Sequence, residues 1–127
     1  MTASPGITGT DFVTLPTQDI ERAKAFYGET LGLEEGAKWG EMPAQEYETG
    51  NLTIAVMDPT AFGQDFQPAS GGSVVLHVED FDAARADLEG KGVRFVTDTI
   101  DSGVCYQAYF LDPDGNVLGI HHRYLPR

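Results

Sequence analysis

The chain repeats one pattern of helix and strand signals at an offset of 61 residues. At this offset the segment QDIERAKAFYGETLGLE aligns with EDFDAARADLEGKGVRF, which places Asp19 over Asp80 and Ala23 over Ala84. Each aspartate precedes apolar residues at helical spacing, as an N-cap residue does. Short alternating apolar runs precede and follow each helix. Because the two copies must share a structure, this repeat constrains the fold more than any other feature.

Each copy predicts the element order β-α-β-β-β, which makes an α+β fold of two tandem βαβββ units. The units cover residues 11–57 and 73–124, and a Gly- and Pro-rich linker covers 58–72. One helix covers only one face of a sheet, so the other faces must meet or curl around something else. We therefore predict one domain over residues 1–127, in which two curled mixed sheets enclose a small-molecule cavity. The predicted strands are 12–15, 33–39, 44–49, 52–57, 73–78, 93–96, 104–111 and 116–124, the predicted helices follow Asp19 and Asp80, and residues 1–10 form an arm.

Charge and composition exclude several classes of partner. The net charge is −12, from 20 acidic and 8 basic residues, and such a field repels nucleic acid and anionic membrane surfaces. No apolar run approaches the length of a membrane span. Cys105 is the single cysteine, so no internal disulfide can form, which is typical of a reducing compartment. With no signal-peptide pattern at the N-terminus, we expect a cytoplasmic protein.

Three strings in this order resemble the vicinal oxygen chelate superfamily, which includes glyoxalase I, extradiol dioxygenases, and fosfomycin and bleomycin resistance proteins. They are DIERAKAFYGETLGLE, VEDFDAARADLEGKGVRF and YFLDPDGNVLGIHH, and together they span most of residues 12–122. The resemblance implies the paired βαβββ fold and its cavity. Within the last string, DPDGN itself predicts a tight turn outside the cavity.

The resemblance also implies where a metal would bind. Metal-using members take one ligand from the first strand and one from the last strand of each unit. Those positions fall here on Phe12, Ala55, Ser73 and Gly119, or on Ile54 if the register slips by one. A catalytic metal site needs about three protein ligands, and these side chains do not supply them. We therefore predict no metal at this site and no cofactor.

Strand alternation separates two faces. Val13, Leu15, Ile54, Val56, Leu118 and Ile120 form a uniformly apolar set that is expected to pack under the helices. The alternate set is mixed, and we expect it to line the ligand cavity together with Trp39 and one tyrosine. Tyr106 and Tyr109 lie on opposite faces of their strand, so only one of them can reach the cavity. Alternation alone does not decide which one it is, and Tyr109 is included among the candidates. The predicted ligand-binding residues are Phe12, Thr14, Trp39, Thr53, Ala55, Met57, Ser73, Val75, His77, Tyr109, Gly119 and His121.

Three side chains are candidates for catalysis. His77 and His121 fall on the cavity face, and imidazoles act as acids, bases or hydrogen-bond partners near neutral pH. Both also fit a structural role. Glu46 could act as a general base if buried, or it could be an exposed carboxylate on an edge strand. The alternation directs His122 to the surface on the opposite face.

The favoured function is a metal-independent binding protein that holds an aromatic or polycyclic ligand, for antibiotic sequestration or self-protection. One alternative is a metal-independent lyase, isomerase or cyclase that uses His77, His121 or Glu46 as its base. Another is a lyase or dioxygenase whose metal is held by those same three residues. A homodimer is expected, and the cavity could form within one chain or across the dimer.

Overall fold

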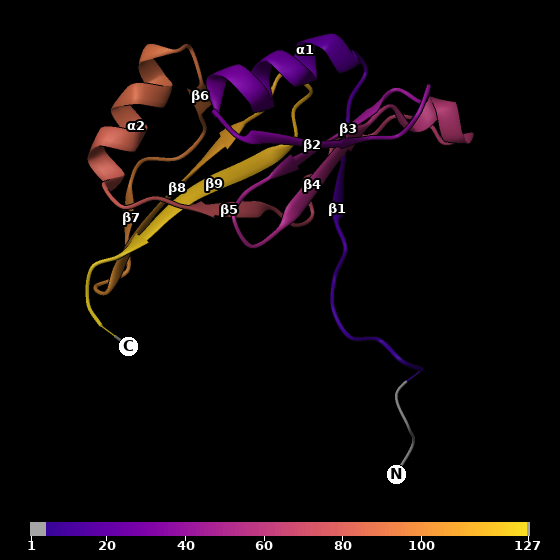
Figure 1. Ribbon diagram of the computed structural model, residues 1–127. Helices are drawn as coiled ribbons and strands as arrows, with labels where there is room; N and C mark the ends of the chain where they lie inside the picture. Colours follow the sequence, from indigo (N-terminus) through magenta and orange to yellow (C-terminus); the bar gives the residue numbers. More distant parts are fainter. Residues whose placement is uncertain (1–4, 127) are drawn as a thin grey trace.

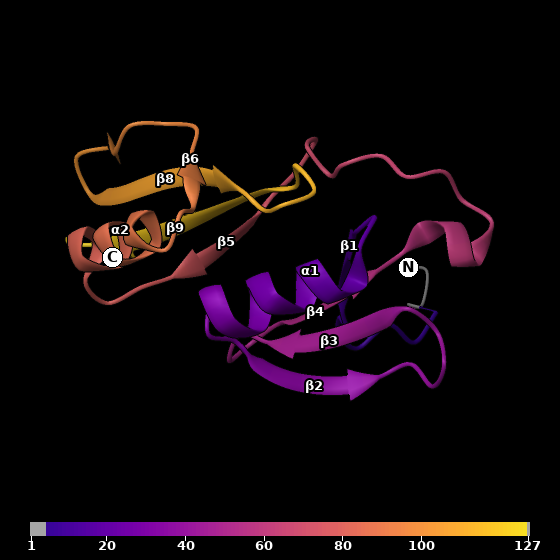
Figure 2. The same cartoon turned by 90° about the horizontal axis from the view of Figure 1, so that it is seen from above.

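The computed structural model describes residues 5–126, and it shows two βαβββ units side by side (Figures 1 and 2). The first unit consists of β1 (Val13–Pro16), α1 (Ile20–Lys24), the π-helix η1 (Ala25–Thr30), β2 (Glu34–Lys38), β3 (Ala44–Glu48) and β4 (Thr53–Met57). The second consists of β5 (Val74–His77), α2 (Phe81–Gly90), β6 (Arg94–Phe95), β7 (Ile100–Asp101), β8 (Cys105–Leu111) and β9 (Val117–Arg123). The 3-10 helix η2 (Pro59–Phe62) begins the connection between the units. The predicted α+β fold is confirmed, with β7 and η2 as additions, and the first four residues of the predicted arm lie outside the described range.

The two sheets share one topology. The strand order is β1-β4-β3-β2 in the first and β5-β9-β8-β6 in the second, where β7 also pairs with β8. The first strand of each unit runs parallel to the last one, and the other pairs are antiparallel. Because β1 and β5 each have one sheet neighbour, both are edge strands.

The predicted helix caps form in both units. The Asp19 side chain accepts a hydrogen bond from the backbone amide of Arg22, and the Asp80 side chain accepts one from Ala83, each at 3.1 Å. Gly32 ends the first helical segment with a φ of 70°, a conformation that favours glycine.

The apolar spacing predicts a single helix after Asp19. In the structure this segment is α-helical only in its first part. It continues as the π-helix η1, and the backbone amide of Leu31 bonds to the carbonyl of Phe26 at 2.9 Å. The spacing of Phe26 and Tyr27, both buried, is compatible with either kind of helix over such a short segment.

Both units contribute to one hydrophobic core on the helix-facing sides of the sheets. Leu15, Ile54 and Leu118 are at most 3% exposed, in agreement with the predicted apolar face. The rings of Phe26 in η1 and Phe110 in β8 lie 6.4 Å apart, so the core crosses from one unit to the other.

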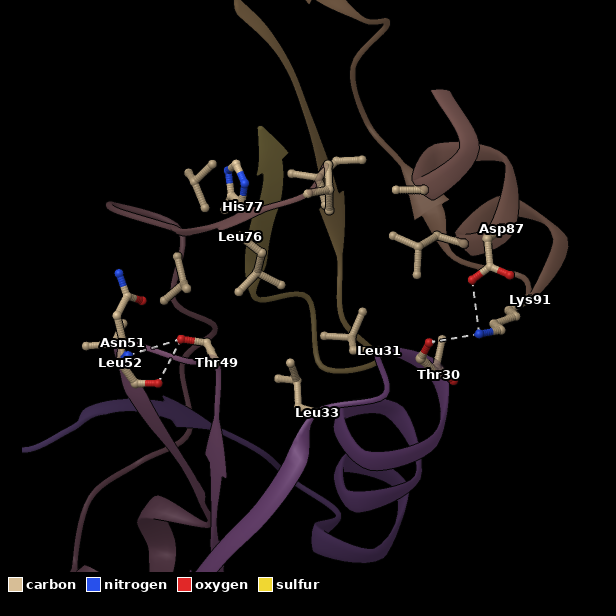
Figure 3. Close-up of a pocket in the computed structure, with 16 residues that line it drawn as sticks. Thr30, Leu31, Leu33, Thr49, Asn51, Leu52, Leu76, His77, Asp87 and Lys91 are labelled. Atoms are coloured by element: carbon tan, nitrogen blue, oxygen red, sulfur yellow. Dashed lines mark hydrogen bonds and ion pairs between the residues drawn. The ribbon is translucent and has the colours of Figure 1, made fainter. Parts of the chain in front are cut away.

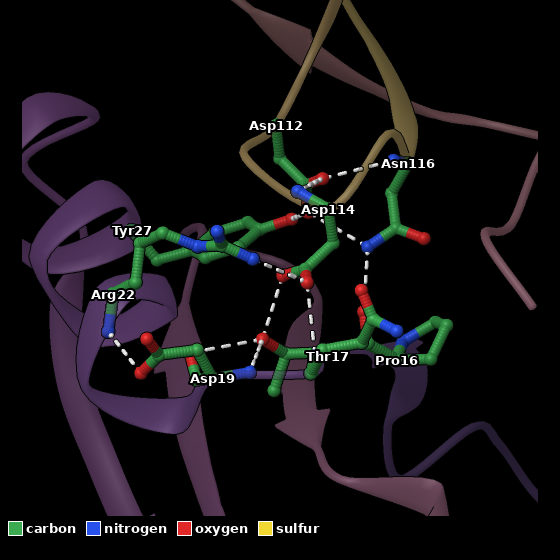
Figure 4. A network of polar contacts seen from close by, with 9 residues as sticks. Pro16, Thr17, Asp19, Arg22, Tyr27, Asp112, Asp114 and Asn116 are labelled. Carbon is green, nitrogen blue, oxygen red and sulfur yellow. Dashed lines mark hydrogen bonds and ion pairs between the residues drawn. The ribbon is translucent and has the colours of Figure 1, made fainter. Parts of the chain in front are cut away.

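The turn between β8 and β9 also connects the units (Figure 4). Asp112, which is 5% exposed, accepts a 2.7 Å hydrogen bond from the hydroxyl of Tyr27 and another from the side-chain amide of Asn116. Asn116 also donates to the backbone carbonyl of Pro16 at 2.8 Å. The turn itself was predicted, and its attachment to β1 and η1 was not.

Asp114 makes a second set of bonds to the first unit. It accepts hydrogen bonds from the hydroxyl of Thr17 at 2.6 Å and from the guanidinium of Arg22 at 2.9 Å. Its side chain is fully buried in this ion pair. The two units are therefore joined by a buried polar network as well as by apolar packing.

None of the helices in residues 5–126 is long and apolar enough to cross a membrane.

Candidate functional site

Each sheet has one face that no helix covers, here called the open face (Figure 1). In the first unit, the register places Thr14, Ala55 and Glu46 in one row across β1, β4 and β3. This row alternates with the buried residues Ile54 and Val56, so it lies on the open face. Thr14 is exposed, Glu46 is half-buried and Ala55 is fully buried.

An aromatic cluster borders this open face. The rings of Phe12 and Trp39 meet edge to face with centroids 5.2 Å apart, and Phe62 meets Trp39 in the same manner at 6.1 Å. Phe12 is 40% exposed and Phe62 is 43% exposed, so the cluster presents apolar surface to solvent. Phe12 and Trp39 are predicted ligand-binding residues, although β1 begins one residue after Phe12. Phe62 lies in the linker, where no alternation marks it.

Glu46 is held in place by the same cluster. The indole Nε1 of Trp39 donates a 2.7 Å hydrogen bond to Oε2 of Glu46. Since β3 lies between β4 and β2, the alternative of a carboxylate on an edge strand is wrong. Glu46 is a half-buried carboxylate with one fixed oxygen and a second that can accept a bond from a ligand.

Thr53 and Met57 occupy the two ends of β4. The Thr53 hydroxyl donates to Glu48, whose two oxygens lie 2.8 and 2.9 Å away, so it is engaged within the sheet. Met57, with Thr14, lines a shallow depression of about 500 Å³ that also includes linker residues such as Gln64. The linker therefore contributes to the rim of the open face.

In the second unit, Tyr109 lies over Gly119 on the open face. The two residues are register partners across β8 and β9, and the Tyr109 hydroxyl donates to Gln107 at 2.7 Å. Tyr106 packs instead against Phe81, at 5.7 Å between ring centroids. Tyr109 is thus the tyrosine of the open face.

The histidines lie in the second unit. His77 and His121 are register partners across β5 and β9. The exposed imidazole of His77 places its Nε2 2.9 Å from Glu79, and the hydrogen bond and charge of His77 lower the pKa of this carboxyl. His122 points to the face opposite His121, as predicted, since its register partner Tyr106 packs against Phe81 of α2. It is half-buried and not on the surface as expected: its Nδ1 lies 3.0 Å from the Val78 carbonyl and its ring lies 6.1 Å from that of His77.

The three residues predicted for catalysis do not form one site within the chain. Glu46 belongs to the first sheet, whereas His77 and His121 belong to the second. The alternative in which these three residues hold one metal is therefore not supported by the arrangement of a single chain.

The positions that carry metal ligands in metal-using relatives do not fit a metal here. A Cβ atom at Gly119 would lie 2.9 Å from the Tyr109 ring, so this ring occupies the space of a ligand side chain. Ala55 is fully buried without a donor atom, Phe12 is an aromatic residue, and Ser73 is exposed. A single hydroxyl is a poor ligand for a divalent ion, so these four positions do not make a metal site.

A groove of about 340 Å³ lies where the two units meet (Figure 3). Leu31, Leu33, Leu52 and Leu76 line it with apolar surface. At its rim, Lys91 pairs with Asp87 at 3.0 Å and reaches the carbonyl of Thr30 at 3.5 Å. Sequence patterns do not reveal this groove. Alternation assigns a residue such as Leu76 to the core, but the way the two units dock leaves Leu76 half-buried.

Within residues 5–126 the two open faces do not cover each other. Thr14, Ser73, Val75 and His77 are all exposed, although they were expected to line an enclosed cavity. One chain thus presents two open faces. That these faces come together to enclose a ligand cavity stays a prediction.

This fold and its uncovered sheet faces define a class of domains built from paired βαβββ units. The chain belongs to the Glyoxalase/Bleomycin resistance protein/Dioxygenase superfamily, whose family model matches residues 9–120.

Several relatives and solved structures are similar to it. Glutathione transferase FosA of Serratia marcescens is 29% identical over 115 residues, which cover 86% of this chain and 77% of the relative. The structure of TnmS3, an antibiotic binding protein from Streptomyces sp. CB03234, has a TM-score of 0.75 at 28% identity, covering 94% of this chain and 99% of that one. A glyoxalase family structure from Bacillus anthracis has a TM-score of 0.78 at 28% identity, covering 95% and 99%.

Proposed function

We propose that this protein binds an aromatic or polycyclic organic molecule on the open faces of its sheets, without a metal ion, and thereby sequesters it. The main support for this proposal is the aromatic cluster of Phe12, Trp39 and Phe62, which presents exposed rings beside the fixed carboxylate of Glu46. Ring faces and edges favour flat aromatic ligands. The similarity to TnmS3, an antibiotic binding protein, supports an antibiotic as the bound molecule.

Two open faces contribute different groups to this site. The first unit and the linker supply the rings and Glu46, and the second unit supplies Tyr109, Val75 and the imidazole of His121. A ligand pocket is mostly apolar, with a few polar groups that fix orientation, which matches this combination. We propose that a second copy of the chain brings one open face over the other and so closes the pocket.

A second candidate is catalysis by the same site without a metal. It is favoured by Glu46, because the Trp39 hydrogen bond fixes one of its oxygens at 2.7 Å and a positioned carboxylate can act as a general base. The similarity to glutathione transferase FosA supports a reaction on the bound molecule. The two candidates differ in whether the ligand leaves unchanged.

Trp39 gives a direct test because it is the single tryptophan of the chain. A thermal-shift screen of aromatic antibiotics comes first, since a ligand at 100 times its dissociation constant stabilises a protein by about 2.7 kcal/mol. Each hit is then titrated by tryptophan fluorescence. We expect Phe12→Ala to weaken binding about ten- to a hundredfold, because the buried contact of one phenylalanine is lost. The matched control is Leu125→Ala, which truncates an apolar residue that is 45% exposed outside the cluster.

The outcome separates the candidates. Binding that changes Trp39 fluorescence and returns the ligand intact supports sequestration. Chemical conversion that falls about 10²–10⁴-fold in Glu46→Gln, with affinity retained, supports the enzyme. If hits bind Phe12→Ala as tightly as the parent protein, the aromatic cluster is not the ligand site.

A further inference from the structure

We propose that His77, Glu79 and His122 form a binding site for a divalent transition-metal ion such as Zn²⁺, at the end of β5. One ligand atom from each of the three side chains lies within 4.8 Å of the other two. The three residues of this site differ from Phe12, Ala55, Ser73 and Gly119, the positions that match the metal ligands of metal-using relatives. It also goes beyond the proposed ligand binding, which requires no metal.

The fold brings these residues together from two directions. His77 is the last residue of β5, and Glu79 follows two positions later, just before α2. β9 runs parallel to β5 and carries His122, one residue beyond the partner of His77. His77 and Glu79 are close in sequence, whereas His122 is far from both. The parallel pairing of β5 with β9 therefore brings the three residues together.

The hydrogen bond of His122 leaves one of its nitrogens ready for a metal. Its Nδ1 lies 3.0 Å from the backbone carbonyl of Val78. A carbonyl only accepts, so Nδ1 carries the hydrogen and Nε2 keeps its lone pair. Metal-binding histidines commonly use this arrangement, in which the outer N–H bonds to a carbonyl and fixes the ring.

The spacing requires only small side-chain movements. Zn²⁺ binds nitrogen and oxygen at about 2.1 Å, which puts two ligands of a tetrahedral site about 3.4 Å apart. The distance between His77 Nε2 and Glu79 Oε1 is 2.9 Å, and the cluster as a whole lies within 4.8 Å. The side chains of His77 and Glu79 are 64% and 88% exposed, so both can adjust without disturbing the core.

The surrounding charge favours a cation. Glu79 supplies a carboxylate oxygen 2.9 Å from His77 Nε2, and the chain as a whole carries a net charge of −12. Two imidazoles and one carboxylate suit Zn²⁺, Ni²⁺ or Cu²⁺ better than Mg²⁺ or Ca²⁺. Three ligands leave at least one coordination position, and His77 also lines the groove between the units. A bound metal would thus lie at the edge of this groove.

The test is a calorimetric titration of untagged, chelator-treated protein with Zn²⁺ near neutral pH. We expect one Zn²⁺ per chain with a micromolar dissociation constant. His122→Asn and Glu79→Gln should each weaken binding more than about tenfold, as the loss of a ligand does. Since the chain has three histidines, His121→Asn is the matched control and should change the affinity less than about twofold.

Two further readouts make the result decisive. Circular dichroism verifies that each variant is folded, and in the wild type, nitrogen chemical shifts of the imidazoles should show Zn²⁺ on Nε2 of His122. The proposal is overturned if the folded wild type takes up no Zn²⁺, or if His122→Asn and Glu79→Gln bind Zn²⁺ as tightly as the wild type. An equal loss in His121→Asn overturns it too. The fluorescence titration of Trp39 is independent, so failure here leaves the proposed ligand binding untouched.

Discussion

Gly119 in β9 lies opposite Tyr109 in β8, and the tyrosine ring covers the space that a side chain at this position would take. A Cβ atom there would lie 2.9 Å from the ring and 3.1 Å from the backbone oxygen of Ala108. Neither contact can be relieved by moving the end of a flexible chain. The absence of a side chain at Gly119 therefore leaves the space that the Tyr109 ring occupies on the open face of the second sheet.

We expect Gly119→Ala to destabilise the protein by about 1–3 kcal/mol, because the added methyl group overpacks this contact. The midpoint of thermal unfolding should fall by several degrees. Gly72→Ala is the matched control, since a Cβ atom there meets nothing within 4 Å. Tyr109→Ala should remove most of the penalty in the double variant. Equal midpoints for Gly119→Ala and Gly72→Ala would contradict this account.

At the scale of the elements, the hydrogen bond between Tyr27 and Asp112 joins η1 to the β8–β9 turn. Burial, followed by the charge and hydrogen bond of Asp112, raises the pKa of the Tyr27 phenol. Because this pKa is higher in the folded state than the value of about 10 in the unfolded state, folding favours the neutral phenol. The associated stability is fully present below about pH 10 and is lost as the pH rises above that value.

Tyr27→Phe should lower the free energy of unfolding by about 1.5–3 kcal/mol at neutral pH, because a hydrogen bond to a charged group is lost. It should also reduce the decline in stability above about pH 10. The decline should not vanish, since burial raises the pKa of Tyr47 to about 12 and the bond to Asp101 raises that of Tyr124 to about 12.

Chemical denaturation at a series of pH values measures both effects. The control is Tyr109→Phe, which loses a bond to the neutral acceptor Gln107 and should cost about 0.5–1.5 kcal/mol. A Tyr27→Phe variant with wild-type stability at neutral pH and the same alkaline decline would show that this bond does not hold the units together.

The elements that sequence predicts well are those defined by short-range patterns. Asp19 and Asp80 cap helices because each offers a side-chain oxygen before an apolar pattern. Ile54 and Leu118 are buried because strand alternation assigns them to the helix-covered face. The repeat then supplies the topology, since both units use the same strand order.

The parts that sequence does not predict depend on where strands end and how the units dock. Phe62 joins the aromatic cluster from a linker without periodicity. The rings of His122 in β9 and His77 in β5 approach to 6.1 Å at the end of β5. Leu76 lines a groove because the first unit does not cover it fully. Distances between segments far apart in sequence decide these contacts, and alternation within one strand carries no such information.

At the scale of the whole molecule, one chain leaves apolar surface exposed and has open strand edges, among them those of β1 and β5. Phe12, Val75 and Ile100 are each about 40% exposed, and β1 and β5 have one sheet neighbour each. Open edges and apolar patches are typical of interaction surfaces. A twofold partner covers the same patch on both copies, so the first unit of one chain can face the second unit of the other.

We therefore expect a homodimer of about 27 kDa, twice the 13.7 kDa of the chain, in sedimentation velocity at micromolar concentration. Val75→Glu should shift the protein toward monomer, because it buries a charge in the interface. It should also weaken ligand binding reported by Trp39, since the pocket then lacks its second wall.

The matched control is Val96→Glu. Val96 is 48% exposed, compared with 41% for Val75, and it follows β6, at the opposite side of the second sheet. This variant should remain dimeric and bind the ligand as the wild type does. A wild-type protein that sediments only as the 13.7 kDa species would show that the open faces do not close across two chains. Dissociation by Val96→Glu but not by Val75→Glu would place the interface on the β6 side and leave the β5 edge free.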